Sequence, residues 1–268
     1  MQSAEVDFAS INKAFSNQSY HFDEDDRGNS ILQDLRKQVY SHVDRFLPVQ
    51  SKILELNAGT GIDALHFVVG GHTIHAIDLS DGMIQQLRKK VLDHQLQGRM
   101  SVQQLSYLDL ENVEGRNYDF VFSNFGGLNC IPDLREVVKS LPVVLRPGGW
   151  VTFVIMPQVC IWEILTVLKG NRNAFRRFNR GGVMAHLEGQ YFRTWYHSLA
   201  SIKEVMGKEF SFVCSEGLAS LSPPPYALRV EKNYESLYKT LRSFDSVFRN
   251  HFPFNRWADH IIVTFQKR

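Results

Sequence analysis

The sequence of 268 residues predicts an α/β protein with a seven-stranded, mostly parallel, doubly wound sheet. The first observation behind this prediction is the alternation of apolar, β-branched runs with runs of helical periodicity from residue 52 to 156. The second is a turn on two glycines, Gly59 and Gly61, directly after the first apolar run. The third is Asp78, which ends the second apolar run about 20 residues after Gly59. Together they predict a βαβ unit of the kind that binds a nucleoside.

Composition and charge limit the classes of protein to which the chain can belong. With 44% hydrophobic and 12% aromatic residues it can bury one sizeable core, and we predict a single domain over residues 1–268. The net charge of +2 argues against nucleic acid or a membrane surface as the default partner. No apolar run approaches the ~20 residues of a membrane span. These observations favour a soluble protein, and the sequence does not indicate an oligomeric state.

The cysteines and the N-terminus predict a cytoplasmic location. Cys130, Cys160 and Cys214 are odd in number and widely spaced, which argues against a disulfide framework or a zinc site. Residues 1–7 carry acidic side chains and no apolar core, unlike a signal peptide. A reducing compartment fits both observations.

Runs of β-branched and apolar residues predict the strands. The run 52–56 comes first, and the run 118–123 is mostly apolar, as in a strand that helices cover on both faces. The other strands are predicted at residues 73–77, 101–105, 150–156, 190–195, 210–215 and 261–265.

Helical periodicity predicts the segments between the strands. Residues 30–47 repeat apolar side chains at helical spacing until Pro48, and residues 1–48 together are expected to form a helical cover. The other helices are predicted at residues 63–69, 81–95, 134–144, 160–168, 198–208 and 234–248. The alternation stops after Pro157, so residues 157–190 are predicted to form a lid-like insertion after strand five, near the substrate cleft.

The residues around the glycine turn indicate which nucleoside is bound. A dinucleotide would bring a pyrophosphate to this turn, where Glu55 would repel it. S-adenosylmethionine has no phosphate, and its sulfonium and amino groups are cations that suit Glu55 and the side-chain carbonyl of Asn57. Residues 54–61, Leu-Glu-Leu-Asn-Ala-Gly-Thr-Gly, resemble the first motif of the class I S-adenosylmethionine-dependent methyltransferases. Gly59 and Gly61 belong to this motif, whereas the family usually has a small residue where Asn57 stands.

The resemblance implies a set of cofactor-binding residues. Asp78 matches the carboxylate that holds both ribose hydroxyls in this family. Shortly after Leu79 the family places an apolar side chain on the adenine, and Met83 is the candidate, although methionine at this spacing is also typical of a core. Leu108 and Asp109 fall where an acid holds the adenine amino group, but an aspartate there can also cap a helix.

Three further residues are expected at the cofactor. Asn124 follows the fourth strand, beside the switch in strand order where ligands bind in an open parallel sheet. Tyr20 and Arg36 resemble residues that close over the cofactor in related small-molecule enzymes. The resemblance suggests that Arg36 pairs with the carboxylate of the cofactor, and the alternative is an ordinary exposed arginine on a helix.

The segment after the insertion is the candidate acceptor site. Residues 191–198 resemble the Tyr-His-Ser stretch that small-molecule members of the family place before strand six. This implies Tyr191, Trp195 and Tyr196 as substrate-binding residues. It also implies His197 as a general base, because histidine titrates near neutral pH. The alternative is that His197 caps the helix that begins near residue 198.

Two other patterns leave alternatives open. The basic segment 169–180 could follow a nucleic acid backbone, with Phe175 and Phe178 stacking on bases. A lid for an anionic small substrate, or a solvated loop, has the same composition, and the low net charge argues against nucleic acid. His72 and His75 are three residues apart, so a strand would place them on opposite faces, and we predict no metal.

The predicted function is transfer of a methyl group from S-adenosylmethionine to O, N or C of a small molecule, which leaves S-adenosylhomocysteine. The protein would contribute mainly by orienting the reactants and excluding water. An RNA or protein methyltransferase, a nicotinamide-dependent oxidoreductase and a non-catalytic binding protein are the alternatives, and Glu55 argues against the second. The sequence does not identify the acceptor.

Overall fold

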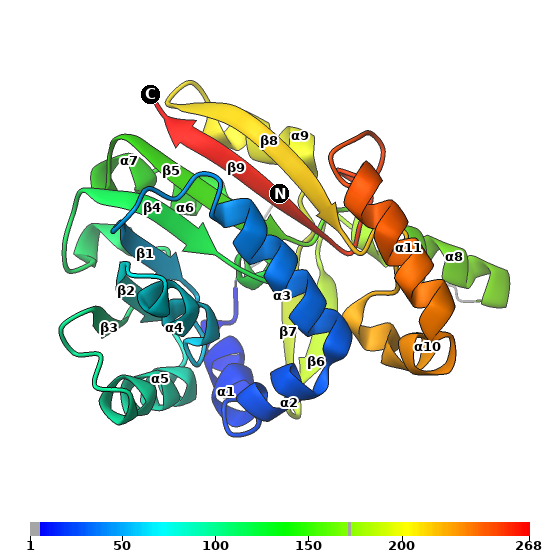
Figure 1. Cartoon of the computed structure of the whole chain (residues 1–268), viewed down its shortest axis with the longest axis horizontal. Coiled ribbons are helices and arrows are strands. Elements are labelled where there is room, and N and C mark those ends of the chain that lie inside the picture. Colours follow the sequence, from blue (N-terminus) through cyan, green and yellow to red (C-terminus); the bar gives the residue numbers. More distant parts are fainter. Residues whose placement is uncertain (1–5, 171–172) are drawn as a thin grey trace.

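The computed structural model describes residues 6–170 and 173–268, and its centre is a seven-stranded sheet with the order β3-β2-β1-β4-β5-β9-β8 (Figure 1). These strands are β1 (Lys52–Leu56), β2 (Thr73–Asp78), β3 (Met100–Gln104), β4 (Tyr118–Ser123), β5 (Leu145–Ile155), β8 (Phe210–Leu218) and β9 (His260–Lys267). The first five run parallel to their neighbours, whereas β9 is antiparallel to both β5 and β8. The predicted seven-stranded, mostly parallel sheet is confirmed.

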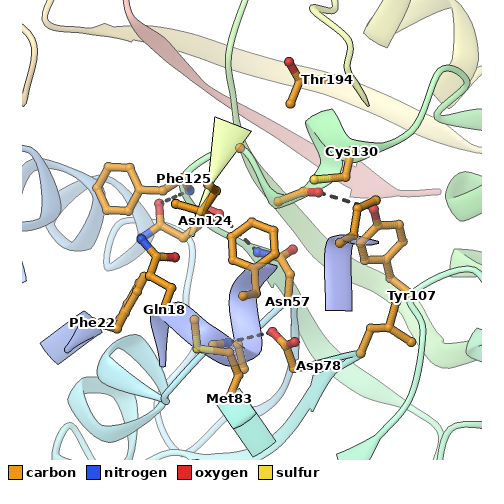
Figure 2. Close-up of a pocket in the computed structure, with 18 of the residues that line it drawn as sticks. Gln18, Phe22, Asn57, Asp78, Met83, Tyr107, Asn124, Phe125, Cys130 and Thr194 are labelled. Carbon is orange, nitrogen blue, oxygen red and sulfur yellow. Dashed lines mark hydrogen bonds between the residues drawn. The ribbon is translucent and has the colours of Figure 1, made fainter. Parts of the chain in front are cut away.

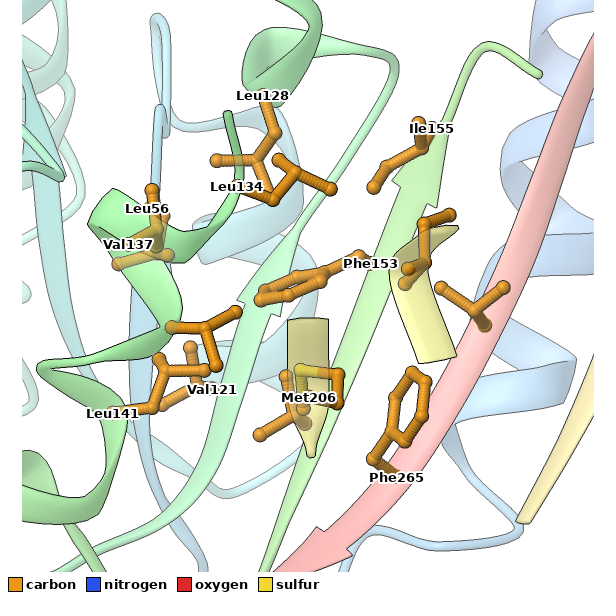
Figure 3. Close-up of a cluster of buried hydrophobic side chains, with 14 of the residues drawn as sticks. Leu56, Val121, Leu128, Leu134, Val137, Leu141, Phe153, Ile155, Met206 and Phe265 are labelled. Atoms are coloured by element: carbon orange, nitrogen blue, oxygen red, sulfur yellow. The ribbon is translucent and has the colours of Figure 1, made fainter. Parts of the chain in front are cut away.

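Helices cover both faces of the sheet, because its strands alternate apolar side chains to either side. Phe120 and Phe122 of β4 belong to one buried cluster, and Val121 between them belongs to another. The second cluster also contains Phe153 and Met206, as Figure 3 shows. The helices connecting or flanking the strands are α3 (Ser30–Val43), α4 (Ile62–Val69), α5 (Asp81–Asp93), α6 (Arg135–Val138), α7 (Leu141–Val144), α9 (Leu199–Met206), α10 (Leu228–Asn233) and α11 (Glu235–Phe248).

The predicted helix at residues 134–144 is two short helices. α6 ends at Val138 and α7 begins at Leu141, with Pro142 in its first turn. Proline is favoured at the start of a helix but lacks the N–H that a continuous helix would need, so the chain begins a new helix here.

The N-terminal cover contains two helices ahead of α3. They are α1 (Phe8–Gln18) and α2 (Phe22–Gly28). Asp7 caps α1 by accepting a hydrogen bond from the backbone nitrogen of Ser10, and Asn29 caps α3 in the same way through Leu32. α1 packs against α5 on one side and against a hairpin from the second half of the chain on the other.

This hairpin is a separate two-stranded sheet formed by β6 (Val183–Leu187) and β7 (Gln190–Thr194). The predicted strand at 190–195 therefore exists but does not join the main sheet. Before the hairpin lie α8 (Ile161–Leu165) and the 3-10 turns η3 (Thr166–Lys169) and η4 (Arg176–Phe178). In Figure 1 the hairpin extends from the main sheet toward α1 and α2, so residues far apart in the chain meet there.

None of the helices within residues 6–170 and 173–268 has the length and apolar character needed to cross a lipid bilayer.

Candidate functional site

A cavity of about 480 Å³ lies at the carboxyl ends of β1, β2 and β4, beneath α1 and the β6–β7 hairpin (Figure 2). Its volume is within the range of small-molecule sites, and its position is where open parallel sheets bind ligands. Two groups of residues line it, one at the carboxyl ends of the strands and one from the N-terminal cover and the hairpin. From the strand ends and the segments that follow them come Asn57, Ala58, Gly59, Ile62, Asp63, Asp78, Leu79, Met83, Ser106, Tyr107, Asn124, Phe125, Gly126, Gly127, Cys130 and Met156. From the cover and the hairpin come Phe8, Ile11, Phe15, Gln18, Phe22, Leu32, Arg36, Ala185, His186, Leu187, Phe192 and Thr194.

The two glycines of the turn have different tasks. Both have positive φ, +58° at Gly59 and +82° at Gly61, a conformation that favours glycine. Gly59 lines the cavity, as predicted for a cofactor-binding residue. Gly61 does not, and a Cβ on it would lie 2.1 Å from a methyl carbon of Leu87. Gly61 therefore allows the start of α4 to pack closely against α5.

Asp78 at the end of β2 faces the cavity and is held by the glycine turn. Its two carboxylate oxygens accept hydrogen bonds from the backbone nitrogens of Gly59 and Ser80, each at 2.8 Å. Burial raises the pKa of this carboxyl above its ordinary value, against these two hydrogen bonds, which favour the ionised form. Leu79 and Met83 line the same end of the cavity, and Met83 is also buried in the core. Its position is thus compatible with contact to the adenine and with a role in the core.

The predicted adenine-binding acid is displaced from the cavity. Asp109 is exposed, and neither it nor Leu108 lines the cavity. Ser106 and Tyr107 line it instead. The Tyr107 hydroxyl donates to the carbonyl oxygen of Gly127 at 3.3 Å, and burial raises the pKa of this phenol well above its ordinary value. The chain turns into a 3-10 helix, η1 (Leu110–Asn112), directly after Asp109, which points that side chain outward.

Asn57 fits a left-handed turn position and does not offer its carbonyl to a ligand. Its φ is +45°, a conformation that asparagine tolerates better than most residues. Its side-chain oxygen accepts from the Ser123 hydroxyl at 2.6 Å, and its amide nitrogen donates to the Asn124 carbonyl at 3.1 Å. Asn57 lines the cavity, but its side-chain carbonyl, predicted to meet a cation, is engaged by Ser123. Asn57 instead joins the ends of β1 and β4.

Glu55 is buried below the cavity and does not line it. It is 1% exposed, and one of its carboxylate oxygens has no hydrogen-bond partner among the residues that the structure describes. Burial raises the pKa of Glu55 well above its ordinary value, and the nearby Asp63 carboxylate adds to this effect. The sequence predicted that Glu55 contacts the cofactor directly, whereas the structure places it as a buried acidic group behind the turn.

Arg36 lines the cavity but already has two acidic partners. Its guanidinium pairs with Asp26 at 2.6 Å and with Asp63, and it lies 4.9 Å from the ring centre of Phe125. Burial alone would raise the pKa of Asp63, but Arg36, Tyr40 and Asn124 hold it below its ordinary value. The charge of Arg36 is thus balanced within the protein. The sequence predicted either an exposed arginine or one that pairs with the cofactor carboxylate, whereas the structure shows a buried arginine that links α2, α3 and α4.

Two more predicted cofactor residues differ in outcome. Tyr20, which is predicted to close over the cofactor, is 77% exposed and lies outside the cavity lining. Asn124 lines the cavity as expected, and its amide donates to Asp63 at 3.0 Å. Gln18 and Phe22, on either side of Tyr20 in the sequence, are two of the cover residues that line the cavity (Figure 2).

The three residues predicted to bind the substrate lie outside the cavity lining. Tyr191 is 63% exposed, Trp195 packs beneath Gly182, and Tyr196 lies against the Arg177 guanidinium. None of the three lines the cavity. Phe192 and Thr194 line it instead, because successive residues of a strand point to opposite sides. The alternation within β7 was the signal that could have found them.

His197 does not lie at the cavity either. It is 8% exposed, and its Nε2 has no hydrogen-bond partner within the described part of the chain. Burial lowers its pKa to about 4, so it is neutral and weakly basic near pH 7. The structure thus places the predicted general base away from the cavity. Ser198 caps α9, since its hydroxyl oxygen accepts from the backbone nitrogen of Ser201.

The basic segment 169–180 is tied to the fold, apart from residues 171–172, which lie outside the described residues. Arg177 is 4% exposed and forms ion pairs with Glu163 and Asp259, each at 2.8 Å. Arg176 binds Glu163 as well, at 2.9 Å. Arg176 therefore holds two parts of the insertion together, and Arg177 ties the insertion to the residue directly before β9. No group of three or more side chains suited to a metal ion occurs over residues 6–170 and 173–268.

Comparison with known proteins finds methyltransferases similar to this chain. Residues 53–149 match the model of a methyltransferase domain family. A demethylmenaquinone methyltransferase of Staphylococcus haemolyticus is 30% identical over 149 residues, which are 53% of this chain and 58% of that protein. The chain therefore spans less than two thirds of this relative. A malonyl-[acyl-carrier protein] O-methyltransferase of Priestia megaterium is 25% identical over 239 residues, 87% of this chain and 77% of that protein.

Solved structures share the fold at low sequence identity. A 1,6-didemethyltoxoflavin-N1-methyltransferase of Burkholderia thailandensis superposes with a TM-score of 0.57 at 14% identity, covering 97% of this chain and 88% of its own. A geranyl diphosphate C-methyltransferase of Streptomyces coelicolor gives 0.58 at 10% identity, with 88% and 81% covered. The strand order, the matched domain, and the glycine turn with Asp78 on one cavity lead to a single conclusion: the chain has the fold of the class I S-adenosylmethionine-dependent methyltransferases, and its residues 53–149 form a methyltransferase domain.

Proposed function

We propose that the protein transfers a methyl group from S-adenosylmethionine to a small-molecule acceptor enclosed in the same cavity. The observation that carries this proposal is the continuity of the cavity, which joins the glycine turn and Asp78 to the side chains of α1 and the β6–β7 hairpin. One space thus offers room for a nucleoside and for an acceptor beside it.

The residues present fit the cofactor. The Asp78 carboxylate has lone pairs beyond those that Gly59 and Ser80 occupy, which suits the two hydroxyls of a ribose. Asp63, whose pKa its neighbours hold below the ordinary value, lines the cavity and places a carboxylate at this end, which suits a ligand that carries cationic groups. When bound, S-adenosylmethionine supplies a methyl group already activated by its sulfonium. The chain's own residues then orient the reactants and exclude water.

The shape of the site favours a small acceptor over RNA or protein. The cover and the hairpin both contribute to the lining, so the acceptor end lies under α1 and β7 and not on an open groove. Arg176 and Arg177, which an RNA-binding insertion would need, are paired with acidic residues. The three cysteines are free thiols, which suits the reducing compartment expected for the protein.

The acceptors named for the relatives differ in how well they fit. Geranyl diphosphate carries several negative charges, yet Arg36 is the one lysine or arginine lining the described cavity, and two carboxylates already balance it. Ring acceptors of the demethylmenaquinone or didemethyltoxoflavin type meet more suitable surroundings, because aromatic and aliphatic side chains form most of the lining.

Calorimetric titration of the purified protein with S-adenosylmethionine, S-adenosylhomocysteine and NAD tests the cofactor. We expect the first two to bind and NAD not to bind. Incubation with S-adenosylmethionine and pools of extracted small molecules, read by release of S-adenosylhomocysteine, then tests the reaction. Binding of NAD in place of both sulfur nucleosides would favour an oxidoreductase. Binding without turnover on any pool, together with turnover on RNA or protein, would overturn the small-molecule acceptor.

A further inference from the structure

One end of the cavity is formed by a single apolar cluster. We call it the apolar wall and define it by Phe8, Ile11, Phe15, Cys130, Leu187 and Phe192, which pack together and all line the cavity. In Figure 2, Cys130 of the wall lies above Asp78 and Met83. Neither Asp78 nor Met83 belongs to the wall, and we assign the wall to the acceptor.

Two aromatic side chains from distant parts of the sequence meet in this wall. The ring centres of Phe15 on α1 and Phe192 on β7 are 5.8 Å apart, with their planes inclined by 45°. Phe8, Ile11 and Phe15 follow one face of α1, because residues spaced by three and four positions share a helix face. Aromatic faces arranged in this way bind flat rings by stacking or edge-to-face contact.

The wall carries no charge that could receive an ionised acceptor. The Asp, Glu, Lys and Arg side chains lining the described cavity are Arg36, Asp63 and Asp78, and His186 is the one histidine in this lining; none of these four belongs to the apolar cluster. Burial raises the pKa of the Cys130 thiol to about 12, so this side chain is neutral as well. An ion placed against the wall would lose its hydration without gaining an opposite charge, which is costly.

Gln18 adds one polar group to the row from α1. It lines the cavity one helical turn beyond Phe15, and its Oε1 atom is buried with no hydrogen-bond partner in the described structure. A buried acceptor atom without a partner is unfavourable unless a ligand supplies a donor. The amide of Gln18 therefore suits an O–H or N–H group on the bound molecule.

We propose that the methyl acceptor is an uncharged, flat, largely apolar ring compound with an O–H or N–H group, held against the apolar wall and oriented by Gln18. The inference rests on the proposed function, because it assigns the acceptor to the space beside the cofactor. It adds the chemical class of the acceptor and names Phe15, Phe192 and Gln18 as residues that determine specificity.

Binding of simple ring probes tests the charge and the wall. Protein saturated with S-adenosylhomocysteine is titrated at pH 7.5 with 2-naphthol, which is neutral, and with 2-naphthoate, which is anionic. We expect 2-naphthol to bind at least about tenfold more tightly than 2-naphthoate. Phe192→Leu should weaken 2-naphthol binding about fivefold or more, since it removes the ring contact but keeps an apolar side chain. Met184→Ala, at a half-exposed position of the same hairpin outside the lining, should change nothing.

A second pair of probes tests Gln18. 2-Methoxynaphthalene keeps the ring of 2-naphthol and lacks its donor. We expect Gln18→Ala to weaken 2-naphthol binding about fivefold and leave 2-methoxynaphthalene unchanged, the usual value of one hydrogen bond. Loss of S-adenosylhomocysteine affinity in Gln18→Ala without this difference would assign Gln18 to the cofactor and overturn its acceptor role.

The two proposals fail in distinguishable ways. If the wild type does not bind S-adenosylhomocysteine, the proposed function itself is wrong. If it binds S-adenosylhomocysteine normally but prefers 2-naphthoate, or if Phe192→Leu binds 2-naphthol like the wild type, the acceptor class is wrong and the methyltransferase function stands. Thermal unfolding of each variant in the absence of ligand shows whether a lost affinity reflects a lost fold.

Discussion

The carboxylate of Asp78 accepts a hydrogen bond of 2.8 Å from the backbone nitrogen of Gly59. The end of β2 and the turn after β1 therefore hold each other in place before any ligand binds. The same carboxylate faces the cavity, so it both fixes the turn and remains available to a ligand. A change at Asp78 should consequently affect cofactor binding through direct contact and through the turn.

Asp78→Ala should weaken the binding of S-adenosylhomocysteine at least about tenfold, because a hydrogen bond to an ionised group contributes roughly 1.5–3 kcal/mol. Titration calorimetry measures this loss. Asp109→Ala is the matched control, since Asp109 is exposed and outside the cavity, and its affinity should equal that of the wild type. Equal losses in the two variants would return the adenine role to Asp109, and no loss in Asp78→Ala would remove Asp78 from the site.

His197→Gln should leave catalysis nearly unchanged. The imidazole is buried away from the cavity, and burial lowers its pKa to about 4. We expect kcat/KM on the true acceptor to change by less than about tenfold, below the 10²-fold or greater loss typical of a general base. A loss of that larger size at unchanged cofactor affinity would restore the catalytic assignment.

The same variant should change how stability depends on pH. Between about pH 4 and 6.5 the unfolded chain binds a proton at His197 that the folded protein does not bind, so this group makes the protein less stable as the pH falls. The effect amounts to at most about 3 kcal/mol, from 1.36 kcal/mol for each pKa unit. Urea unfolding at pH 7.5 and pH 5 should therefore show that the free energy of unfolding falls less between the two pH values in His197→Gln than in the wild type. Identical losses would show that the folded protein protonates His197 normally.

Arg36→Met should destabilise the protein by about 3–5 kcal/mol, because it leaves the Asp26 and Asp63 carboxylates buried without their cation. Urea unfolding gives the free energy. Arg242→Met provides a control, since Arg242 is more exposed in its pair with Asp34 and such pairs contribute about 0–1 kcal/mol. Adding Asp26→Asn and Asp63→Asn to Arg36→Met should recover part of the loss. Equal stability of the two arginine variants would contradict the buried link.

Turnover should not require a metal ion. The described residues contain no cluster of three or more metal-binding side chains, and the proposed transfer needs none to activate the methyl group. Activity measured after dialysis against EDTA should equal that of the untreated enzyme. Activity that EDTA removes and magnesium restores would show that a metal takes part.

The sequence could predict the site where the signal is local, and it failed where tertiary contacts decide. The glycine turn and Asp78 lie within one βαβ unit, so spacing alone located them. The sequence analysis named Tyr191 as lining the acceptor site, whereas Phe192 lines the cavity. The family resemblance indicated the segment but not which face of β7 meets the cavity. Phe15 escaped notice because its partner lies in a hairpin far along the chain, and nothing near either residue encodes that contact.

The packing of Asn57 also limits how this site can evolve. A Cβ on Gly127 would lie 2.3 Å from the side-chain amide carbon of Asn57, so the two positions form an epistatic pair. Gly127→Ala in the native background should be disruptive, whereas the same change after Asn57→Gly no longer meets the three Asn57 atoms that lie nearest. A mutational path that adds a side chain at residue 127 must therefore begin at residue 57, and libraries that vary residue 127 alone will sample mostly damaged enzymes.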